Sequence, residues 1–226
     1  MPTLTWLQVS INVQLYIIQR MDFKSEFITP ARDRRARRSR SALLRAAIDL
    51  VTERGTAAIP ITDFADAADV SRQVVYQQFG DRDTLLLEAA IDLARRELLP
   101  RIDDTHALDG RAQALATASH FAGHRRFYRA LLMSSCAFVL NKGLTGLLLP
   151  INREGIREIY SERLDPQMLD DVATYVTGGG TSLLNAWLVD GEDPLDPEEF
   201  TDRLMRMLSF LAWAHRTATG DTERGQ

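Results

Sequence analysis

Four side chains within residues 72–77 are of the types that can read nucleic-acid bases. Arg72, Gln73, Tyr76 and Gln77 supply a guanidinium group, two carboxamides and a phenol. Side chains of these types reach base edges from the major groove of DNA, and arginine also binds phosphate oxygens. The face they form is polar without being strongly charged. Such chemistry requires an element that presents these side chains outward.

Two short helices joined by a tight turn are predicted to position them. The pattern predicts one helix from Ile61 to Ala68 and a second from Arg72 to Phe79, with Ser71 as the N-cap of the second. Small residues in the first helix would let the two backbones approach closely. We expect five residues to hold the pair together: Phe64, Ala65, Ala68, Val70 and Val75.

An amphipathic helix is expected on each side of this pair. From Leu43 to Val51 apolar residues follow helical spacing, and Gly55 supplies a C-terminal stop. After the pair, Asp81 and Asp83 open a longer helix, where acidic residues suit the positive end of the helix dipole. Its inner face is predicted to consist of Leu85, Leu86, Ala89, Ala90, Leu93 and Ala94.

An arginine-rich segment, residues 31–40, precedes the first of these helices. It holds six arginines and one aspartate. One interpretation is a solvated, charged lead-in. The other is an arm whose arginines, Arg37 and Arg38 among them, contact phosphates or enter the minor groove. Its position beside the helix pair favours the arm. Residues 1–82 hold 12 Lys and Arg against 9 Asp and Glu, whereas the remainder holds 15 against 22, so the basic character is confined to the N-terminal part.

The remaining chain is predicted to form a helical body. Helices are expected near 111–122, 124–139 and 152–164, while the stretch Gly143–Pro150 stays undecided. A polar link, Asp190–Pro197, separates two apolar stripes that predict the last two helices. The stripes are Leu169, Val172, Ala173, Val176, Gly180, Leu183, Leu184 and Trp187, and then Phe200, Leu204, Met207, Leu208 and Leu211.

Roughly residues 40 to 90 resemble the TetR family of transcriptional regulators. Outside this segment the resemblance is limited to length and helical character. There, Gly178-Gly179-Gly180 and Trp187 are similar to the final helix pair of many members. The specific resemblance lies in Ala68-Asp69-Val70-Ser71-Arg72, Tyr76, Phe79, Arg82-Asp83 and Leu85-Leu86, and upstream in Ala46-Ala47, Leu50-Val51 and Arg54-Gly55.

The resemblance implies an all-α fold of about nine helices. An N-terminal extension (1–30) would precede a three-helix helix-turn-helix DNA-binding domain (31–82). A C-terminal effector-binding and dimerisation domain (83–218) and a disordered tail (219–226) would follow. It implies a cytoplasmic homodimer, joined through the last two helices, that binds a palindromic double-stranded DNA operator. Its function would be that of a repressor released by an unknown small-molecule effector.

Carried over position by position, the resemblance implies a set of DNA contacts. Gln73 and Tyr76 would stand among the base-reading positions, with Arg72 and Gln77 beside them. Arg82 falls where the family commonly has a lysine that faces a phosphate. Thr62, Arg37 and Arg38 complete the predicted DNA-binding residues.

Three residues depart from the family pattern. Pro60 offers no capping oxygen, so the first short helix is expected to start nearer Thr62. Asp69 replaces the usual turn glycine, and aspartate tolerates the left-handed conformation better than most residues. Gly80-Asp81 puts a carboxylate near the expected DNA backbone, which should weaken non-specific affinity.

Effector-binding residues are predicted in the body, with a competing interpretation left open. Aromatic residues with a polar group suit a ligand cavity. The alternative is a DNA-binding regulator controlled by a protein partner, or by nothing, with a body too well filled to bind a small molecule. The predicted effector residues are Phe127, Tyr128, Leu131, Tyr175 and Trp187.

Other chemistry is not expected. The sequence has no nucleophile elbow, dinucleotide fingerprint or phosphate loop, so we expect neither an enzyme nor a cofactor. His120 and His124 have metal-ligand spacing, but no cysteine or acidic cluster stands near them in sequence, so no metal site is expected. Cys136 is expected to be a buried, unpaired thiol. Residues 1–20 lack the features of a signal peptide or membrane span, and Met21 is favoured as the true start.

Overall fold

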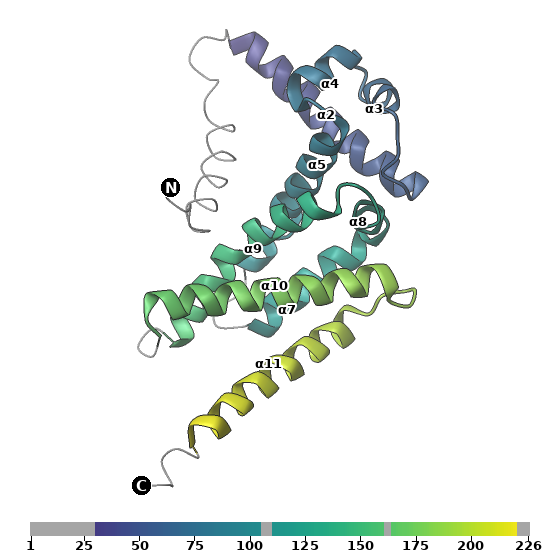
Figure 1. Cartoon of the computed structure of the whole chain (residues 1–226). Coiled ribbons are helices and arrows are strands. Elements are labelled where there is room, and N and C mark those ends of the chain that lie inside the picture. Colours follow the sequence, from purple (N-terminus) through teal and green to yellow (C-terminus); the bar gives the residue numbers. More distant parts are fainter. Residues whose placement is uncertain (1–29, 105–109, 161–163, 221–226) are drawn as a thin grey trace, which may run out of the picture.

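The computed structural model describes residues 30–104, 110–160 and 164–220, and all of its regular elements are helices. The predicted all-α class is therefore confirmed for these residues. A small head lies at one end of the molecule, and a larger body of long helices lies at the other (Figure 1). No described helix is both long and apolar enough to cross a lipid bilayer. The predicted extension and tail lie almost wholly outside the described residues.

Three helices form the head: α2 (Pro30–Arg54), α3 (Ile61–Ala67) and α4 (Arg72–Phe79). Each of them contacts the other two. Gly55, at a φ of 65°, ends α2 by donating its N–H to the carbonyl of Val51. The apolar centre of the head is fully buried and includes Leu43, Ala47, Val51, Ile59, Phe64, Ala65 and Val75.

Helix α5 (Arg82–Glu97) joins the head to the body, because it packs on α2 and α4 and also on α6 and α9. Asp81 caps its first turn by accepting a hydrogen bond from the N–H of Thr84 at 2.7 Å. All six residues predicted for its inner face are buried. The prediction for this helix is confirmed.

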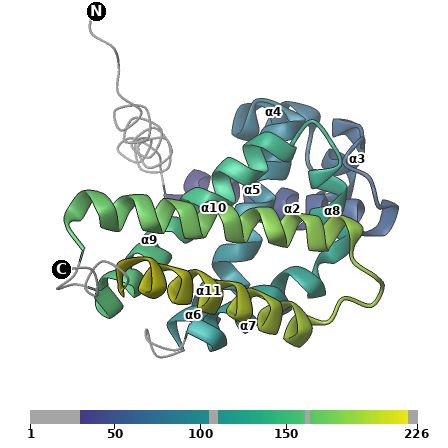
Figure 2. The ribbon, with the colours of Figure 1, turned by 60° about the horizontal axis from the view of Figure 1, so that its bottom comes forward.

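The body consists of α6 (Leu99–Asp103), α7 (Gly110–Gly123), α8 (Arg125–Leu132), α9 (Ala137–Tyr160), α10 (Pro166–Asp190) and α11 (Pro197–Gly220). Helix α10 packs along α9, and α11 packs against α7 (Figure 2). Arg111 of α7 pairs with Glu198 and Asp202 of α11, each at 2.8 Å. Trp187 stacks on Phe200 at the link between α10 and α11, with ring centroids 4.4 Å apart.

Two predictions for the body were wrong in their boundaries. The helix expected over 124–139 is interrupted by a turn at residues 133–136. There the hydroxyl of Ser134 donates to the carbonyl of Leu131 at 2.8 Å and accepts from the N–H of Cys136 at 3.1 Å. Such local side-chain hydrogen bonds compete with those of a helix. The helix expected near 152–164 is part of α9, which begins at Ala137, runs through the undecided stretch with Pro150 inside it, and ends at Tyr160.

Two predictions for the head were also wrong. The arginine-rich segment does not precede the first helix, because α2 begins at Pro30 and includes it. Arginine is a good helix former, and no glycine interrupts the segment. Helix α3 starts at Ile61, as the pattern predicted, and the shift toward Thr62 expected from Pro60 does not occur. The N–H of Asp63 donates to the carbonyl of Pro60 at 3.1 Å, so this N–H has a partner without a side-chain cap.

Candidate nucleic-acid interface

The turn between α3 and α4 sets the angle at which α4 leaves the head. Asp69 adopts a left-handed backbone conformation, with a φ of 51°. The N–H of Val70 then reaches back to the carbonyl of Ala65 at 2.9 Å. Ser71 is extended and is the N-cap residue, as predicted, although its side chain makes no capping hydrogen bond. The turn therefore depends on the conformation of Asp69.

One side of α4 is fixed to the rest of the head. Val75 and Phe79 are buried. The guanidinium of Arg40 lies over the Phe79 ring, 4.8 Å from its centroid, and also pairs with Glu88 of α5. The carboxamide of Gln78 donates to the carbonyl of Ala36 at 3.5 Å. Helices α2 and α5 together hold α4, so its opposite side has a defined orientation.

The other side of α4 is exposed and carries the four predicted side chains, Arg72, Gln73, Tyr76 and Gln77. Tyr76 is 55% exposed although it is a large ring, and no packing within the chain accounts for that position. An exposed aromatic and three exposed polar side chains on a rigidly held short helix form a surface that could enter a groove of DNA.

Arg82 and Thr62 lie on the parts of the head that flank α4. Arg82 is half-buried at the start of α5 and pairs with Asp83 at 3.1 Å. It lines a shallow hollow together with Tyr76 and Asp81. Thr62 is half-buried in the first turn of α3 and donates to Asp63 at 3.2 Å. Asp81 adds a negative charge beside Tyr76 and also caps α5.

Arg37 and Arg38 are exposed on α2, in the stretch that contacts α4. Ala36, the residue before them, accepts the hydrogen bond from Gln78 near the end of α4. The arginine-rich segment and α4 are therefore neighbours in space, although they are more than thirty residues apart in sequence. A basic helical segment thus lies next to α4.

The structure does not gather the five predicted effector residues around one cavity. Phe127, Tyr128 and Leu131 are fully buried in the core, and Trp187 packs on Phe200. Tyr175 is 67% exposed on the outside of α10. None of the five lines the larger cleft, which lies between the head and the body. Four of the five, all except Tyr175, pack in the core, so their helical spacing reflects core packing.

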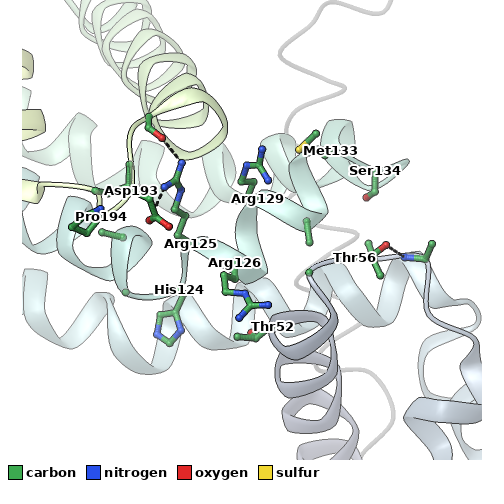
Figure 3. A pocket seen from close by; sticks show the side chains of 18 of the residues that line it. Thr52, Thr56, His124, Arg125, Arg126, Arg129, Met133, Ser134, Asp193 and Pro194 are labelled. Atoms are coloured by element: carbon green, nitrogen blue, oxygen red, sulfur yellow. Dashed lines mark hydrogen bonds and ion pairs between the residues drawn. The ribbon is translucent and has the colours of Figure 1, made fainter.

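That larger cleft lies between the head and the body and encloses about 1270 Å³. Its lining comes from the end of α2 and the following loop, from α8, and from the link between α10 and α11 (Figure 3). Four arginines line it, Arg82 at the start of α5 and three in α8. Arg125 pairs with Asp193 at 2.9 Å, Arg126 donates to the carbonyl of Glu53 at 3.0 Å, and Arg129 donates to that of Val189 at 3.1 Å.

Two residues that position α4 were not identified from the sequence. Arg40 was grouped with the charged segment, and Gln78 was not distinguished from its neighbour Gln77. Helical spacing from the apolar Val75 and Phe79 would have placed Gln78 on the inner side of α4. Nothing in the sequence indicates that Arg40 packs on Phe79, because that contact depends on how α2 crosses α4.

The head and the helical body define this chain as a helix-turn-helix protein. Residues 43–89 match the family model described as bacterial regulatory proteins, tetR family. The match covers the helix-turn-helix of the head and the start of α5, and it is to a family of transcriptional regulators. It is 40% identical over 68 residues to the HTH-type transcriptional regulator AlkX of Mycobacterium tuberculosis, and this alignment spans 30% of each chain.

Solved structures agree with the fold. A putative TetR-family transcriptional regulator from Rhodococcus sp. superposes with a TM-score of 0.56 at 19% identity, covering 76% of this chain and 97% of its own. The fatty acid degradation regulator FadR from Bacillus halodurans gives a TM-score of 0.53 at 17% identity, covering 74% and 96%. At these identities the similarity concerns the fold alone.

Proposed function

We propose that this protein is a DNA-binding transcriptional regulator that acts as a homodimer on a palindromic operator. The observation that carries the proposal is the exposed side of α4. Gln73 and Tyr76 face outward there, while the opposite side is held by Val75, Phe79 and the Arg40 contact. A helix held this rigidly loses little conformational freedom on entering the major groove, which favours specific binding.

The outer face of α10 supports dimerisation through the last two helices. Three consecutive glycines, Gly178, Gly179 and Gly180, lie within this helix, and a Cβ added to any of them would meet no other element of the described chain within 4 Å. Glycine inside a helix costs about 0.5–1 kcal/mol relative to alanine. Packing within one chain gives no reason for this cost, whereas close approach of a second α10 would.

The same face of α10 is uncharged over three turns. Its exposed residues from Thr174 to Ala186 are Thr174, Tyr175, Gly178, Gly179, Ser182 and Ala186. A solvent-facing helix surface ordinarily carries charged side chains. We therefore assign this surface to the two-fold interface, with Tyr175 in it. Two-fold symmetry then requires two operator half-sites about 34–36 Å apart, one turn of DNA.

We further propose that a small-molecule effector releases the protein from its operator, so that it acts as a repressor in the cytoplasm. The cleft between head and body supports this, because its lining combines residues 55–58 beside α3 with Arg125 and Arg129 of α8. A ligand there would contact both parts and would favour whichever relative arrangement it binds better. The effector residues predicted from the sequence are replaced in this proposal by the cleft.

The second candidate is a regulator controlled by a protein partner, or by nothing. It is favoured by the filled core around Phe127, Tyr128 and Leu131 and by the internal hydrogen bonds that already engage the cleft arginines. A metabolite that raises the melting temperature and also releases bound operator would exclude this candidate. A full library without such a compound would exclude the effector-controlled one.

The DNA-binding proposal is tested by selecting duplexes from a randomised pool with the purified full-length protein. We expect an inverted repeat to be enriched, with an affinity that falls steeply as salt rises. The matched control is a variant with Gln73 and Tyr76 both changed to alanine, which keeps the buried side of α4 intact. Recovery of unrelated sequences by the native protein, or of the same inverted repeat by the variant, would contradict the proposal.

A further inference from the structure

Three side chains with metal-binding atoms meet where α5, α7 and α8 come together. Glu97 is the last residue of α5, His120 lies in α7, and His124 is the residue immediately before α8. One ligand atom from each of the three lies within 4.8 Å of the other two. The two histidines are four residues apart in sequence, and Glu97 comes from a different helix, so only the fold brings the third group to the pair.

His120 is held in a form that can donate a lone pair to a metal ion. Its side chain is 2% exposed, and its Nε2 lies 2.9 Å from the hydroxyl of Tyr128. When that hydroxyl donates its proton to the carbonyl of Ala90, 3.4 Å away, it accepts the proton on Nε2 of His120. The Nδ1 atom then carries the lone pair, and it is buried without a hydrogen-bond partner.

The charge state of this histidine agrees with the geometry. Burial lowers the pKa of His120 to about 4, so the imidazole is neutral at neutral pH. Metal-bound histidines commonly donate their second ring N–H to another group, which fixes the ring orientation. Here Tyr128 is that group.

Glu97 and His124 complete the set on the solvent side. His124 Nε2 lies 2.7 Å from a carboxylate oxygen of Glu97, and both side chains are about one third exposed. Two imidazoles and one carboxylate are a recurrent ligand set for zinc, with nitrogen and oxygen atoms about 2.0–2.2 Å from the ion and a fourth position for water. Small rotations of the Glu97 and His124 side chains would turn their ligand atoms away from each other and toward a shared ion.

We propose that Glu97, His120 and His124 form a binding site for a divalent transition-metal ion of the zinc class. The ion would join the C-terminal end of α5 to the α7–α8 junction. This site differs from the expectation of no metal, which considered only groups close in sequence to the histidines. None of its residues belongs to the head, although His124 also lines the cleft between head and body.

A simple helix-to-helix ion pair between Glu97 and His124 would account for those two residues but not for His120. A buried imidazole whose second nitrogen has no partner points to a missing ligand. Arg101 acts against the site, because its positive charge contributes to the lowered pKa of His120.

Titration of the metal-free full-length protein with Co²⁺ and Zn²⁺ tests the proposal. We expect one Co²⁺ per chain, visible absorption that Zn²⁺ removes, and a melting temperature that rises with metal concentration. His124→Ala and Glu97→Gln should each weaken binding more than about tenfold, because each removes one of three ligands. Both residues are half-exposed, so both variants should fold, which circular dichroism verifies.

The matched control changes the two other histidines, His106→Asn and His215→Asn together. This variant should bind Co²⁺ like the native protein. Equal affinity in the native protein and in His124→Ala would overturn the site, as would no binding by the native protein. Loss of binding in the control with retention in His124→Ala would place the ion elsewhere and would also overturn it. Each outcome is independent of whether the protein binds DNA.

Discussion

The guanidinium of Arg40 lies 4.8 Å from the centroid of the Phe79 ring and also pairs with Glu88. Arg40 belongs to the arginine-rich segment of α2, and Phe79 is the last residue of α4. One arginine of that segment thus supports α4, whereas Arg37 and Arg38 are exposed on α2 and stay predicted contacts to DNA. The crossing of α2 and α4 therefore gives Arg40 a structural role that its exposed neighbours in sequence do not share.

Changing Arg40 to alanine should lower stability and weaken DNA binding. The contact with Phe79 and the half-exposed pair with Glu88 together contribute about 1–2 kcal/mol. Chemical denaturation and operator titration measure the two effects. Arg38→Ala is the control, and it should leave stability unchanged while reducing the salt dependence of binding by about one unit of slope. Equal destabilisation by both substitutions would contradict the distinction.

Gln73→Ala and Arg82→Ala should affect DNA binding in different ways. Loss of a base-reading amide should relax sequence preference at one position of each half-site, at a cost of about 1–3 kcal/mol. Loss of the Arg82 charge should weaken binding to all sequences alike and lower the salt slope. Titrations against single-base operator variants distinguish the two. An unchanged preference profile in Gln73→Ala would remove Gln73 from the base-reading residues.

Asp69→Val should destabilise the head, whereas Asp69→Gly should not. A β-branched residue in the left-handed conformation costs about 1–2 kcal/mol, while glycine adopts it freely. Thermal unfolding of both variants measures the difference. Asp66→Val, on the exposed side of α3, is the control and should change stability by less than about 0.5 kcal/mol. If valine were tolerated equally at both positions, the turn would not depend on the φ of residue 69.

Gly179→Arg should convert the proposed dimer to a monomer without unfolding the chain. Arginine is a better helix former than glycine by about 0.8 kcal/mol, so α10 itself is not weakened. Gly146→Arg, in the exposed part of α9, is a matched control because its added Cβ also meets nothing within 4 Å. Sedimentation analysis should show loss of association in the first variant and none in the second. Dimers in both variants would exclude this face of α10.

Cys136 should resist thiol reagents in the folded protein. It is a buried free cysteine, as expected from its apolar surroundings, and burial raises the pKa of its thiol. The thiolate is the reactive form, so both access and ionisation are reduced. Labelling with an aromatic disulfide should proceed slowly on the native protein and reach one equivalent per chain in guanidinium chloride. Rapid labelling before unfolding would show that the α8–α9 turn opens.

The sequence predicted the helix pair and its exposed face well because local signals agreed there. Apolar spacing fixed the inner side of α4, and Asp81 marked the start of α5. The errors arose where a local signal was absent or misread. Ser134 interrupts the helix expected over 124–139 through hydrogen bonds to nearby backbone groups, a pattern that periodicity does not reveal. Tyr128 and Trp187 were predicted to line a cavity. Aromatic residues have the same spacing along a helix whether they line a cavity or fill a core, so the sequence does not distinguish the two.

By itself, the sequence determined the all-helical class and the position of the candidate DNA-reading helix, α4. It also determined the residues on the outer side of α4, since helical spacing alone sets which side chains share a face. Tertiary structure decided which residues from different helices meet. Arg40 reaches Phe79, and Glu97 reaches His120 and His124, only because α2 and α5 cross their neighbours at particular points. Contacts between distant segments depend on the packing of whole helices, and no local pattern encodes them.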